Sequence, residues 1–296
     1  MDTKLEIQEF LTSRRGRITP AQAGVRTFGS GPRRVTGLRR EEVASLAGVS
    51  VAYYTKLERG DASGVSDSVL EALSRALQLD DAERAHLFDL VRAQQPAART
   101  RRRRNAPQAI RPGVQRLLDR IDAPAYIRNG RMDILATNKL GEALYSEILA
   151  NPRRPANTAR FCFLDPRAPT FFVDWDETAG ASVAVLRAEA GRNPHDQDLM
   201  NLIGELSTQS EDFRVSWARH DVGTHDAGVK RLHHPIVGRL ELTYEGMTLA
   251  ADPDLVLFAF TAEVGSKSEQ ALNLLASWAA TPDQQTSAFV RSGTKG

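Results

Sequence analysis

The sequence has one cysteine and no long apolar run. The lone Cys162 excludes a framework of intrachain disulfides and fits a reducing compartment. Because Cys162 stands among apolar residues, we expect a buried side chain rather than a redox switch. No stretch approaches the roughly 18 apolar residues that a membrane-spanning helix needs, and the charged start, Met1 to Glu9, is unlike a signal peptide. We therefore expect a cytoplasmic protein with no membrane partner.

Motifs of catalysis and metal binding are also missing. The sequence has no nucleophile elbow and no zincin pattern, and the glycine pair of Gly29-Ser30-Gly31 follows no strand pattern that would make it a phosphate loop. We therefore predict no catalytic residue and no enzymatic activity. The histidines of the second half match no metal-ligand spacing, so no metal is predicted either. These histidines are His195, His220, His225, His233 and His234.

The length and the distribution of charge indicate two parts. The 296 residues, 41% hydrophobic and 26% charged, suffice for two globular domains of ordinary composition. Residues 1–105 carry 19 Lys and Arg against 13 Asp and Glu, a net of +6, whereas the remainder carries 20 against 24, a net of −4. The basic first third favours contact between that part and a polyanion such as a nucleic acid.

A stretch rich in proline, alanine and arginine divides the chain. Residues 94–111 read QQPAARTRRRRNAPQAIR and hold almost no large apolar side chain, which is typical of a linker. We predict a first domain at residues 1–95, a basic linker at 96–110 and a second domain at 111–290. The run Arg101–Arg104 is interpreted as a solvated hinge, and a phosphate-contacting tail is the alternative.

The periodicity of apolar residues predicts an all-α first domain and an α+β second domain. In the first domain we expect five helices, with a long loop from Arg14 to Gly37 between the first two. The helices are Leu5–Ser13, Arg39–Ala47, Val51–Glu58, one capped by Ser66 and one opened by Asp80 and Asp81.

The second domain combines strand and helix patterns. Asn129-Gly130 predicts a two-residue type I′ turn between strands at 125–128 and 132–137. Further strands are expected at Leu240–Tyr244 and, as a central strand, at Leu255–Ala262. Helices are expected at Asn138–Leu149, Trp175–Ala190, Gln197–Thr208, Ser210–Ala218 and Ser266–Ala279.

The stretch LRREEVASLAGVSVAYYTKLERG, residues 38–60, predicts a helix-turn-helix. Such a motif needs a small residue where the two helices touch and a glycine that adopts a left-handed conformation in the turn. Ala44 and Gly48 meet these needs at the right spacing, and Ser50 is placed to cap the second helix. Tyr54 and Leu57 are assigned to the core.

This arrangement would present the start of the second helix to the major groove. We predict DNA-binding residues of two kinds. Those expected at base edges and the helix start are Ser50, Val51, Ala52, Tyr53, Thr55 and Lys56. Those expected at phosphates are Arg39, Arg40 and Arg59, with solvated charged helix ends as the alternative.

The same stretch resembles the repressor-type (phage repressor and Cro-like) helix-turn-helix family, and in particular its MmyB-like regulators. The resemblance continues through NTARFCFLDP, DWDETAGASVAVLRAEAGR, DLMNLIGELS, FRVSWARHDV and KRLHHPIVGRLELTYE, so it covers nearly the whole chain. It implies a PAS-like sensor fold for the second domain. Because at least one member of the family holds a fatty acid, it also implies a non-covalent fatty acid or similar amphiphile as ligand, with no other cofactor.

A sensor pocket needs an apolar lining and a few convergent polar groups. The predicted ligand-binding residues are Phe172, Trp175, Arg187, Phe213, Trp217 and His220. The aromatic residues have an ordinary core role as their alternative, Arg187 has an internal salt bridge, and His220 has the orientation of a loop.

The predicted partners are double-stranded DNA, a small apolar ligand and a second copy of the chain. A homodimer is expected because one recognition helix reads only a few base pairs, and paired half-sites lie about 34 Å apart. Two alternatives remain for the second domain: a protein-interaction module, or a divergent enzyme with clustered titratable groups. The arginines of the segment from Arg14 to Gly37 are predicted to reach the minor groove or the DNA backbone, with a flexible insertion as the alternative.

Overall fold

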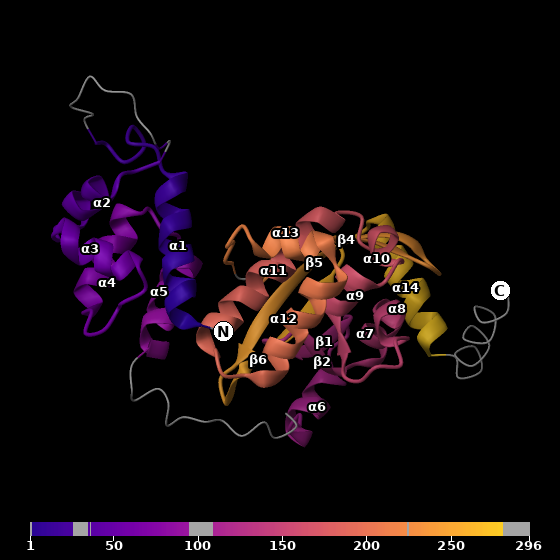
Figure 1. The fold of residues 1–296 in the computed structure, drawn as a ribbon. Helices are drawn as coiled ribbons and strands as arrows, with labels where there is room; N and C mark the ends of the chain where they lie inside the picture. Colours follow the sequence, from indigo (N-terminus) through magenta and orange to yellow (C-terminus); the bar gives the residue numbers. More distant parts are fainter. Residues whose placement is uncertain (1, 26–34, 36, 95–108, 224, 281–296) are drawn as a thin grey trace. The chain divides into compact units, whose positions relative to one another are not determined.

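The computed structural model describes residues 2–25, 35, 37–94, 109–223 and 225–280. The chain forms two compact units (Figure 1). Unit 1 combines Met1–Asn105 with Val183–Thr224, and unit 2 combines Ala106–Ser182 with His225–Gly296. Val183–Thr224, which the sequence places in the second domain, is therefore packed in unit 1. Arg101–Arg104 lie outside the described residues.

Five helices make up the N-terminal part of unit 1, as predicted. They are α1 (Thr3–Arg17), α2 (Arg40–Ala47), α3 (Val51–Glu58), α4 (Asp67–Ala76) and α5 (Asp81–Gln94). The Ser66 hydroxyl accepts a hydrogen bond from the backbone N–H of Val69 at 3.4 Å, and the Asp80 carboxylate accepts one from Glu83 N–H at 2.8 Å, so both predicted caps are present.

Helix α1 is longer than predicted, and this shortens the loop expected from Arg14. Its buried face continues from Ile7 and Phe10 to Arg14, which is 2% exposed. The apolar stripe of α1 ends before Arg14 in the sequence, so periodicity alone places the helix end too early.

The core of unit 1 draws on both stretches of the chain. Its centre contains Phe10, Leu38, Tyr54 and Leu87, which are at most 1% exposed, and Val222 belongs to the same cluster. The second stretch holds the end of α11 (Trp175–Arg192), α12 (Gln197–Gln209) and α13 (Glu211–Trp217). None of the described helices is both long and apolar enough to cross a lipid bilayer.

Unit 2 is built on an antiparallel sheet whose strand order is β3-β2-β1-β6-β5-β4. Strand β6 lies between β1 and β5, which confirms the prediction of a central strand. The strands are β1 (Ala125–Asn129), β2 (Asp133–Thr137), β3 (Ala156–Asn157), β4 (Ala227–His234), β5 (Gly238–Leu249) and β6 (Asp252–Thr261).

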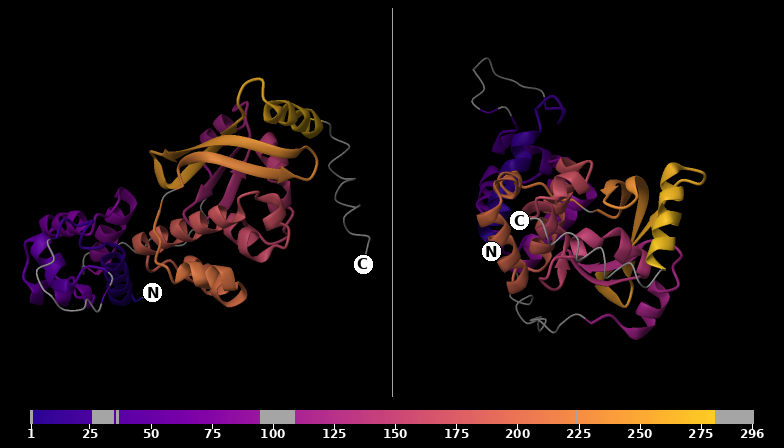
Figure 2. Two further views of the ribbon diagram at one scale, coloured as in Figure 1. Left: turned by 90° about the horizontal axis from the view of Figure 1, so that it is seen from above. Right: turned by 90° about the vertical axis from the view of Figure 1, so that its right-hand side faces the viewer.

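Alternation along the strands gives the sheet two apolar faces. Tyr126 lies opposite Phe258 in the register and stacks on it at 5.4 Å between ring centroids, on the face that also holds Phe260. Ala125 and Ile127 belong to a separate cluster with α6 (Pro112–Leu118). Figure 2 shows the last helix beside the long strands. The remaining helices of unit 2 are α7 (Lys139–Leu144), α8 (Ser146–Leu149), α9 (Thr158–Leu164), α10 (Ala168–Phe171) and α14 (Lys267–Ala279).

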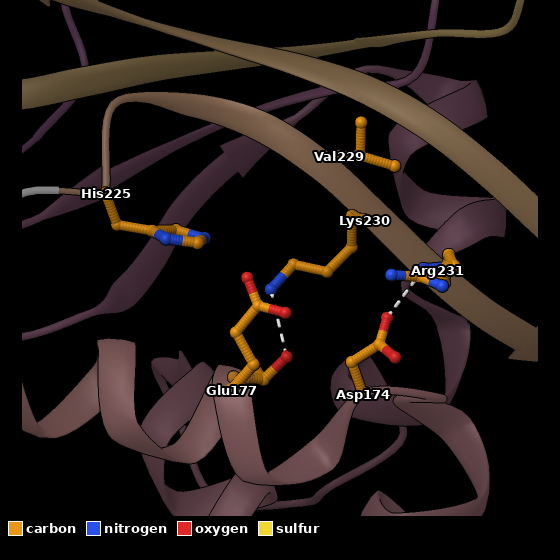
Figure 3. A pocket seen from close by; sticks show the side chains of 7 residues that line it. Asp174, Glu177, His225, Val229, Lys230 and Arg231 are labelled. Carbon is orange, nitrogen blue, oxygen red and sulfur yellow. Dashed lines mark hydrogen bonds and ion pairs between the residues drawn. The ribbon is translucent and has the colours of Figure 1, made fainter.

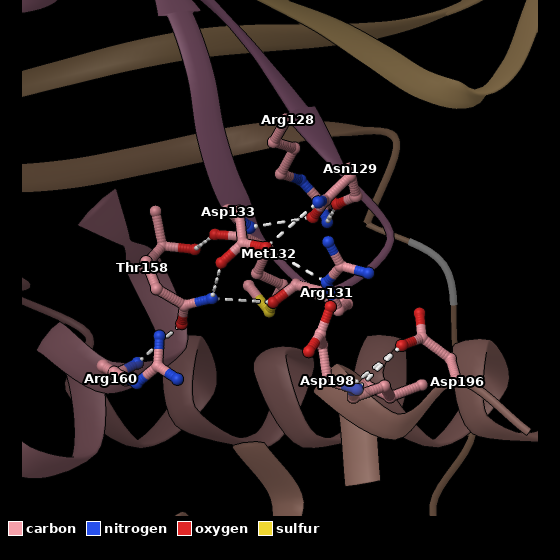
Figure 4. A network of polar contacts seen from close by, with 11 residues as sticks. Arg128, Asn129, Arg131, Met132, Asp133, Thr158, Arg160, Asp196 and Asp198 are labelled. Carbon is pink, nitrogen blue, oxygen red and sulfur yellow. Dashed lines mark hydrogen bonds and ion pairs between the residues drawn. The ribbon is translucent and has the colours of Figure 1, made fainter. Parts of the chain in front are cut away.

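The β1–β2 hairpin forms where it is predicted, but its turn is not the type I′ turn that Asn129-Gly130 indicates. Met132 carries the left-handed φ of +67°, and its N–H binds the carbonyl of Asn129 at 3.0 Å. The Asn129 side chain instead binds the backbone N–H of Asp133 at 3.0 Å, and Asp133 accepts a further bond from Asn157 at 2.8 Å (Figure 4). These bonds fix the longer turn and join it to the start of α9.

Candidate functional sites

The helix-turn-helix of unit 1 has the geometry that the sequence predicts. Ala44, 1% exposed, lies in the contact between α2 and the core, and Gly48 adopts φ +67° in the turn. The Ser50 hydroxyl caps α3 by accepting a hydrogen bond from Tyr53 N–H at 3.1 Å. Tyr54 and Leu57 are buried, as assigned. A side chain at position 48 would meet no neighbouring atom, so the conformation of the turn, rather than space, favours glycine there.

The opposite face of α3 is presented to solvent. Val51 and Tyr53 are 47% and 37% exposed. Thr55 is half-buried. Ala52, Lys56 and Arg59 are exposed as well, so this face offers methyl, phenol, hydroxyl and cationic groups along one helix.

A buried carboxylate holds α3 against α1 and α2. Glu58 binds Arg15 through both oxygens, at 3.0 and 2.9 Å, and Arg40 through one, at 3.1 Å. Burial by itself would raise the pKa of Glu58, but hydrogen bonds and charge from Arg15 and Arg40 lower it overall. Arg40 is half exposed, so it can contact a phosphate while it keeps its bond to Glu58. Arg39 is exposed at the start of α2, beside Glu41 at 3.4 Å.

Unit 2 contains a small pocket between β4 and the first turns of α11 (Figure 3). It encloses about 10 Å³, the space of roughly one water molecule. At its centre the Lys230 ammonium donates a hydrogen bond to the Thr178 hydroxyl at 3.2 Å and lies 5.5 Å from the ring of Phe172. The lining residues are Asp174, Glu177, Thr178, His225, Val229, Lys230 and Arg231.

Burial sets the protonation of the groups around this pocket. It lowers the pKa of Lys230 to about 8, so the ammonium form dominates at pH 7. Burial and then the charges of Lys230 and Arg128 lower the pKa of His225 to about 3, and its neutral ring bonds the Tyr244 hydroxyl at 3.0 Å. Burial raises the pKa of the free Cys162 thiol to about 12, in agreement with the predicted buried, unreactive side chain.

Both parts of the chain match known families. Residues 110–275 match the model of the MmyB-like transcription regulator ligand binding domain, and residues 11–87 match a helix-turn-helix domain. The chain belongs to the MmyB-like regulators. No curated protein matches it. This MmyB-like chain is thus a DNA-binding transcription regulator with a ligand-binding domain.

The six residues predicted to line the ligand site of this MmyB-like regulator fall into both units. Phe172 and Trp175 belong to unit 2, where Phe172 packs on Lys230 and the Trp175 indole binds the carbonyl of Cys162 at 2.9 Å. The other four belong to unit 1 and do not share that pocket. They are Arg187, Phe213, Trp217 and His220.

Arg187 has the second of its two predicted roles, the internal salt bridge. Its side chain is 1% exposed, and it forms an ion pair with Glu6 of α1 at 2.9 Å. It also donates to the carbonyl of Trp217 and lies 4.1 Å from that ring, which stacks on Phe213. Trp217 and Phe213 therefore pack against each other and beside Arg187 within unit 1.

The His220 ring is directed at α1. The backbone of His220 adopts φ +56°, and the ring's Nε2 lies 3.4 Å from a carboxylate oxygen of Glu9. Ligand atoms of Glu6, Glu9 and His220 lie within 4.8 Å of one another, which is a spacing suitable for a metal ion. Arg187 already pairs with Glu6, however, and positive charge from nearby arginines helps lower the pKa of His220 to about 4 after burial. That positive potential opposes a cation.

The predicted arginine-rich loop needs correction at its start. Arg14 and Arg15 lie in α1 and form buried ion pairs with Glu83 and Glu58 at 2.8 and 2.9 Å. Arg17, also in α1, pairs with Asp221 at 2.5 Å. These three arginines do not extend from a loop toward DNA. Arg26, Arg33 and Arg34 lie outside the described residues.

Sequence reasoning missed Lys230 and Thr178 as site residues. The signal was present but weak, because strand β4 was not predicted. Once β4 is known, alternation places Lys230 with Leu232 and His234, and the latter two are at most 1% exposed. A lysine on the inward side of a strand is then a candidate binding residue.

Proposed function

We propose that this regulator reads a specific DNA sequence with the exposed face of α3 and that unit 2 senses a small amphiphilic ligand such as a fatty acid. The exposed Val51 and Tyr53 carry the first part of the proposal. Both side chains lie near the start of the second helix of the motif, which enters the major groove in helix-turn-helix proteins, and a thymine methyl or a base edge is a suitable partner there. Lys230 in its pocket supports the second part.

A PAS-like fold and a homodimer belong to the same proposal. The antiparallel sheet of unit 2, with helices on its aromatic face, supports a PAS-like sensor. Dimerisation would pair two α3 helices on half-sites about 34 Å apart. Analytical sedimentation tests this by measuring how many copies of the chain bind DNA that carries one half-site and DNA that carries two. A single copy on the two-site DNA contradicts it.

Selection from random DNA, followed by fluorescence anisotropy on the selected site, tests the reading of DNA. Replacement of Thr55 or Tyr53 by alanine should cost about 1–3 kcal/mol on that site and relax preference at one or two base pairs. Arg59→Ala should instead weaken binding to all DNA sequences alike and reduce the number of ions released on binding, read from the salt dependence of the affinity, by about one. Arg75→Ala is the matched control, because Arg75 is exposed on α4. Equal effects of Arg75 and Arg59 would contradict the assignment.

Native mass spectrometry of the purified chain, followed by organic extraction, tests the sensing. We expect a co-purifying amphiphile whose removal changes affinity for the selected DNA. A chain that carries no such cargo and takes up no offered lipid would contradict this part and leave the DNA-binding part intact.

The groups beside Lys230 argue for binding rather than catalysis in this pocket. A nucleophile or general base needs a pKa near the working pH. The pKa values of Cys162 and His225, about 12 and about 3, lie far from it. That of Lys230, about 8, lies near it, but the ammonium form that dominates at pH 7 can neither attack a substrate nor take up a proton. We therefore propose that the regulator is not an enzyme, and that it acts in the cytoplasm.

A further inference from the structure

The Lys230 ammonium lacks a counter-ion. Its Nζ makes one hydrogen bond, to Thr178, and in the described part of the chain no carboxylate lies within 4.0 Å of it. Asp174, which lines the same pocket, is already paired with Arg231 at 2.9 Å. An ammonium that is largely removed from water is costly unless it is paired. Two of its three N–H bonds remain available to a ligand.

The inner surroundings of Lys230 favour an anion. The rings of Phe172 and Tyr244 lie 5.5 and 5.9 Å from Nζ, and such cation–π contacts offset only part of the ammonium charge. After burial, the low pKa of His225 reflects the combined positive charge of Lys230 and Arg128. Glu177 is the opposing charge, but its side chain is exposed at the rim, where water screens it. The electrostatic potential inside the pocket is therefore positive, whereas the negative charge of Glu177 lies at its rim.

We propose that Lys230 is the anchor for the carboxylate of an organic-acid ligand, with the Thr178 hydroxyl as a second donor. The proposal rests on the ligand-sensing function proposed above and names the chemical group that is sensed. One ammonium matches the single charge of a carboxylate, and the pocket's volume of about 10 Å³ suits one oxygen of that group. A phosphate, with a charge of about −1.5 to −2 and three acceptor oxygens, would need more donors than Lys230 and Thr178 supply.

Two probes separate the carboxylate from the apolar chain. Octanoate and octan-1-ol have the same tail, and calorimetric titration into the full chain at pH 7.0 measures each. Lys230→Met removes the charge and keeps an apolar stem of similar length. Lys267→Met is the matched control, because Lys267 is an exposed lysine of α14.

We expect Lys230→Met to weaken octanoate at least tenfold and octan-1-ol less than twofold, while Lys267→Met changes neither. Glu177→Gln should strengthen octanoate about two- to threefold, since it removes a like charge beside the bound carboxylate. Circular dichroism and thermal midpoints check that the variants fold. The Glu177 variant keeps the inference testable if Lys230→Met is unstable.

The wild-type chain provides an independent test through pH. Octanoate affinity should fall as Lys230 loses its proton above about pH 8, while octan-1-ol affinity stays constant. The neighbouring titratable groups do not interfere, since the pKa values of Cys162 and Tyr244 are about 12 and that of His225 is about 3. The other charged groups that face Lys230 are Asp174, Glu177, Arg128 and Arg231.

Three outcomes would overturn the inference. They are an equal loss of both probes in Lys230→Met, an octanoate affinity that this variant leaves unchanged, and a wild-type chain that does not bind octanoate. If octan-1-ol alone binds, apolar sensing stands and the carboxylate anchor falls. If neither probe binds, both the carboxylate anchor and the proposed sensing function are contradicted.

Discussion

Removal of Arg187 should destabilise unit 1 strongly, because it leaves the Glu6 carboxylate buried without a partner. The side chains of Arg187 and Glu6 are 1% and 9% exposed, and their ion pair is 2.9 Å long. Breaking a buried pair of this kind from one side costs about 3–5 kcal/mol. The loss of the cation–π contact with Trp217 adds to this cost, so we expect about 4 kcal/mol or more for Arg187→Met.

Urea unfolding observed through Trp217 is a suitable assay, with Trp175 and Trp278 replaced by phenylalanine. The double variant Glu6→Leu with Arg187→Met removes both charges, and we expect it to recover most of the loss. Arg192→Met is the control on the same helix: Arg192 is 52% exposed in its ion pair with Glu189, so its loss should cost less than about 1 kcal/mol. An Arg187 variant as stable as the Arg192 variant would refute the reasoning.

The pH dependence of this loss has a definite sign. Burial raises the pKa of Glu6 above its usual value even beside Arg187. Removal of Arg187 raises that pKa further, because the stabilising positive charge is gone. The folded variant then binds a proton more readily than the unfolded chain does. Its deficit in stability should therefore be largest at neutral pH and shrink as the pH falls through the pKa of the buried Glu6.

Three further predictions concern the scaffold of the two sites. Gly48→Ala should cost about 1–2 kcal/mol, measured by urea unfolding, because an L-residue is strained at φ +67°. Glu58→Gln should cost about 3 kcal/mol at pH 7, by the same assay, since it removes the shared partner of Arg15 and Arg40. Because the pKa of Glu58 is lowered, its contribution should be present above the unfolded pKa of about 4.5 and be lost below it. Gly141→Ala should lower the thermal midpoint of unit 2, because a Cβ there would lie 2.2 Å from the Ala125 carbonyl oxygen.

Most elements of the fold could be predicted from local sequence signals. The caps Ser50 and Ser66 and the turn residue Gly48 act within a few residues of themselves, so the sequence alone places them. The face of α3 follows in the same way, because Tyr54 and Leu57 at helical spacing fix which side is buried. The β1–β2 turn was wrong in its type for the opposite reason. The Asn129 side chain is held by hydrogen bonds with Asp133, so it does not favour the left-handed conformation at Asn129 and Gly130 that a type I′ turn needs.

The ligand candidates were harder to predict, because their partners lie far along the chain. Aromatic residues at helical spacing describe the core of either unit equally well, so Phe172 and Phe213 could not be assigned to different units from sequence. Lys230 depends on Thr178, which is 52 residues away, and on the inward parity of a strand that was not predicted. Pairings of that range are set by the packing of the whole unit rather than by any local pattern.

Arg187 shows where such reasoning ends. An arginine within the small and apolar run VAVLRAEAG must be buried or leave the helix face exposed, and burial requires an anion. The sequence therefore indicates that a carboxylate meets Arg187, but a ligand and an acidic residue satisfy the requirement equally. The partner, Glu6, lies 181 residues earlier in α1. Because Glu6 already neutralises Arg187, Lys230, which has no carboxylate within 4.0 Å among the described residues, is the stronger candidate for a carboxylate ligand.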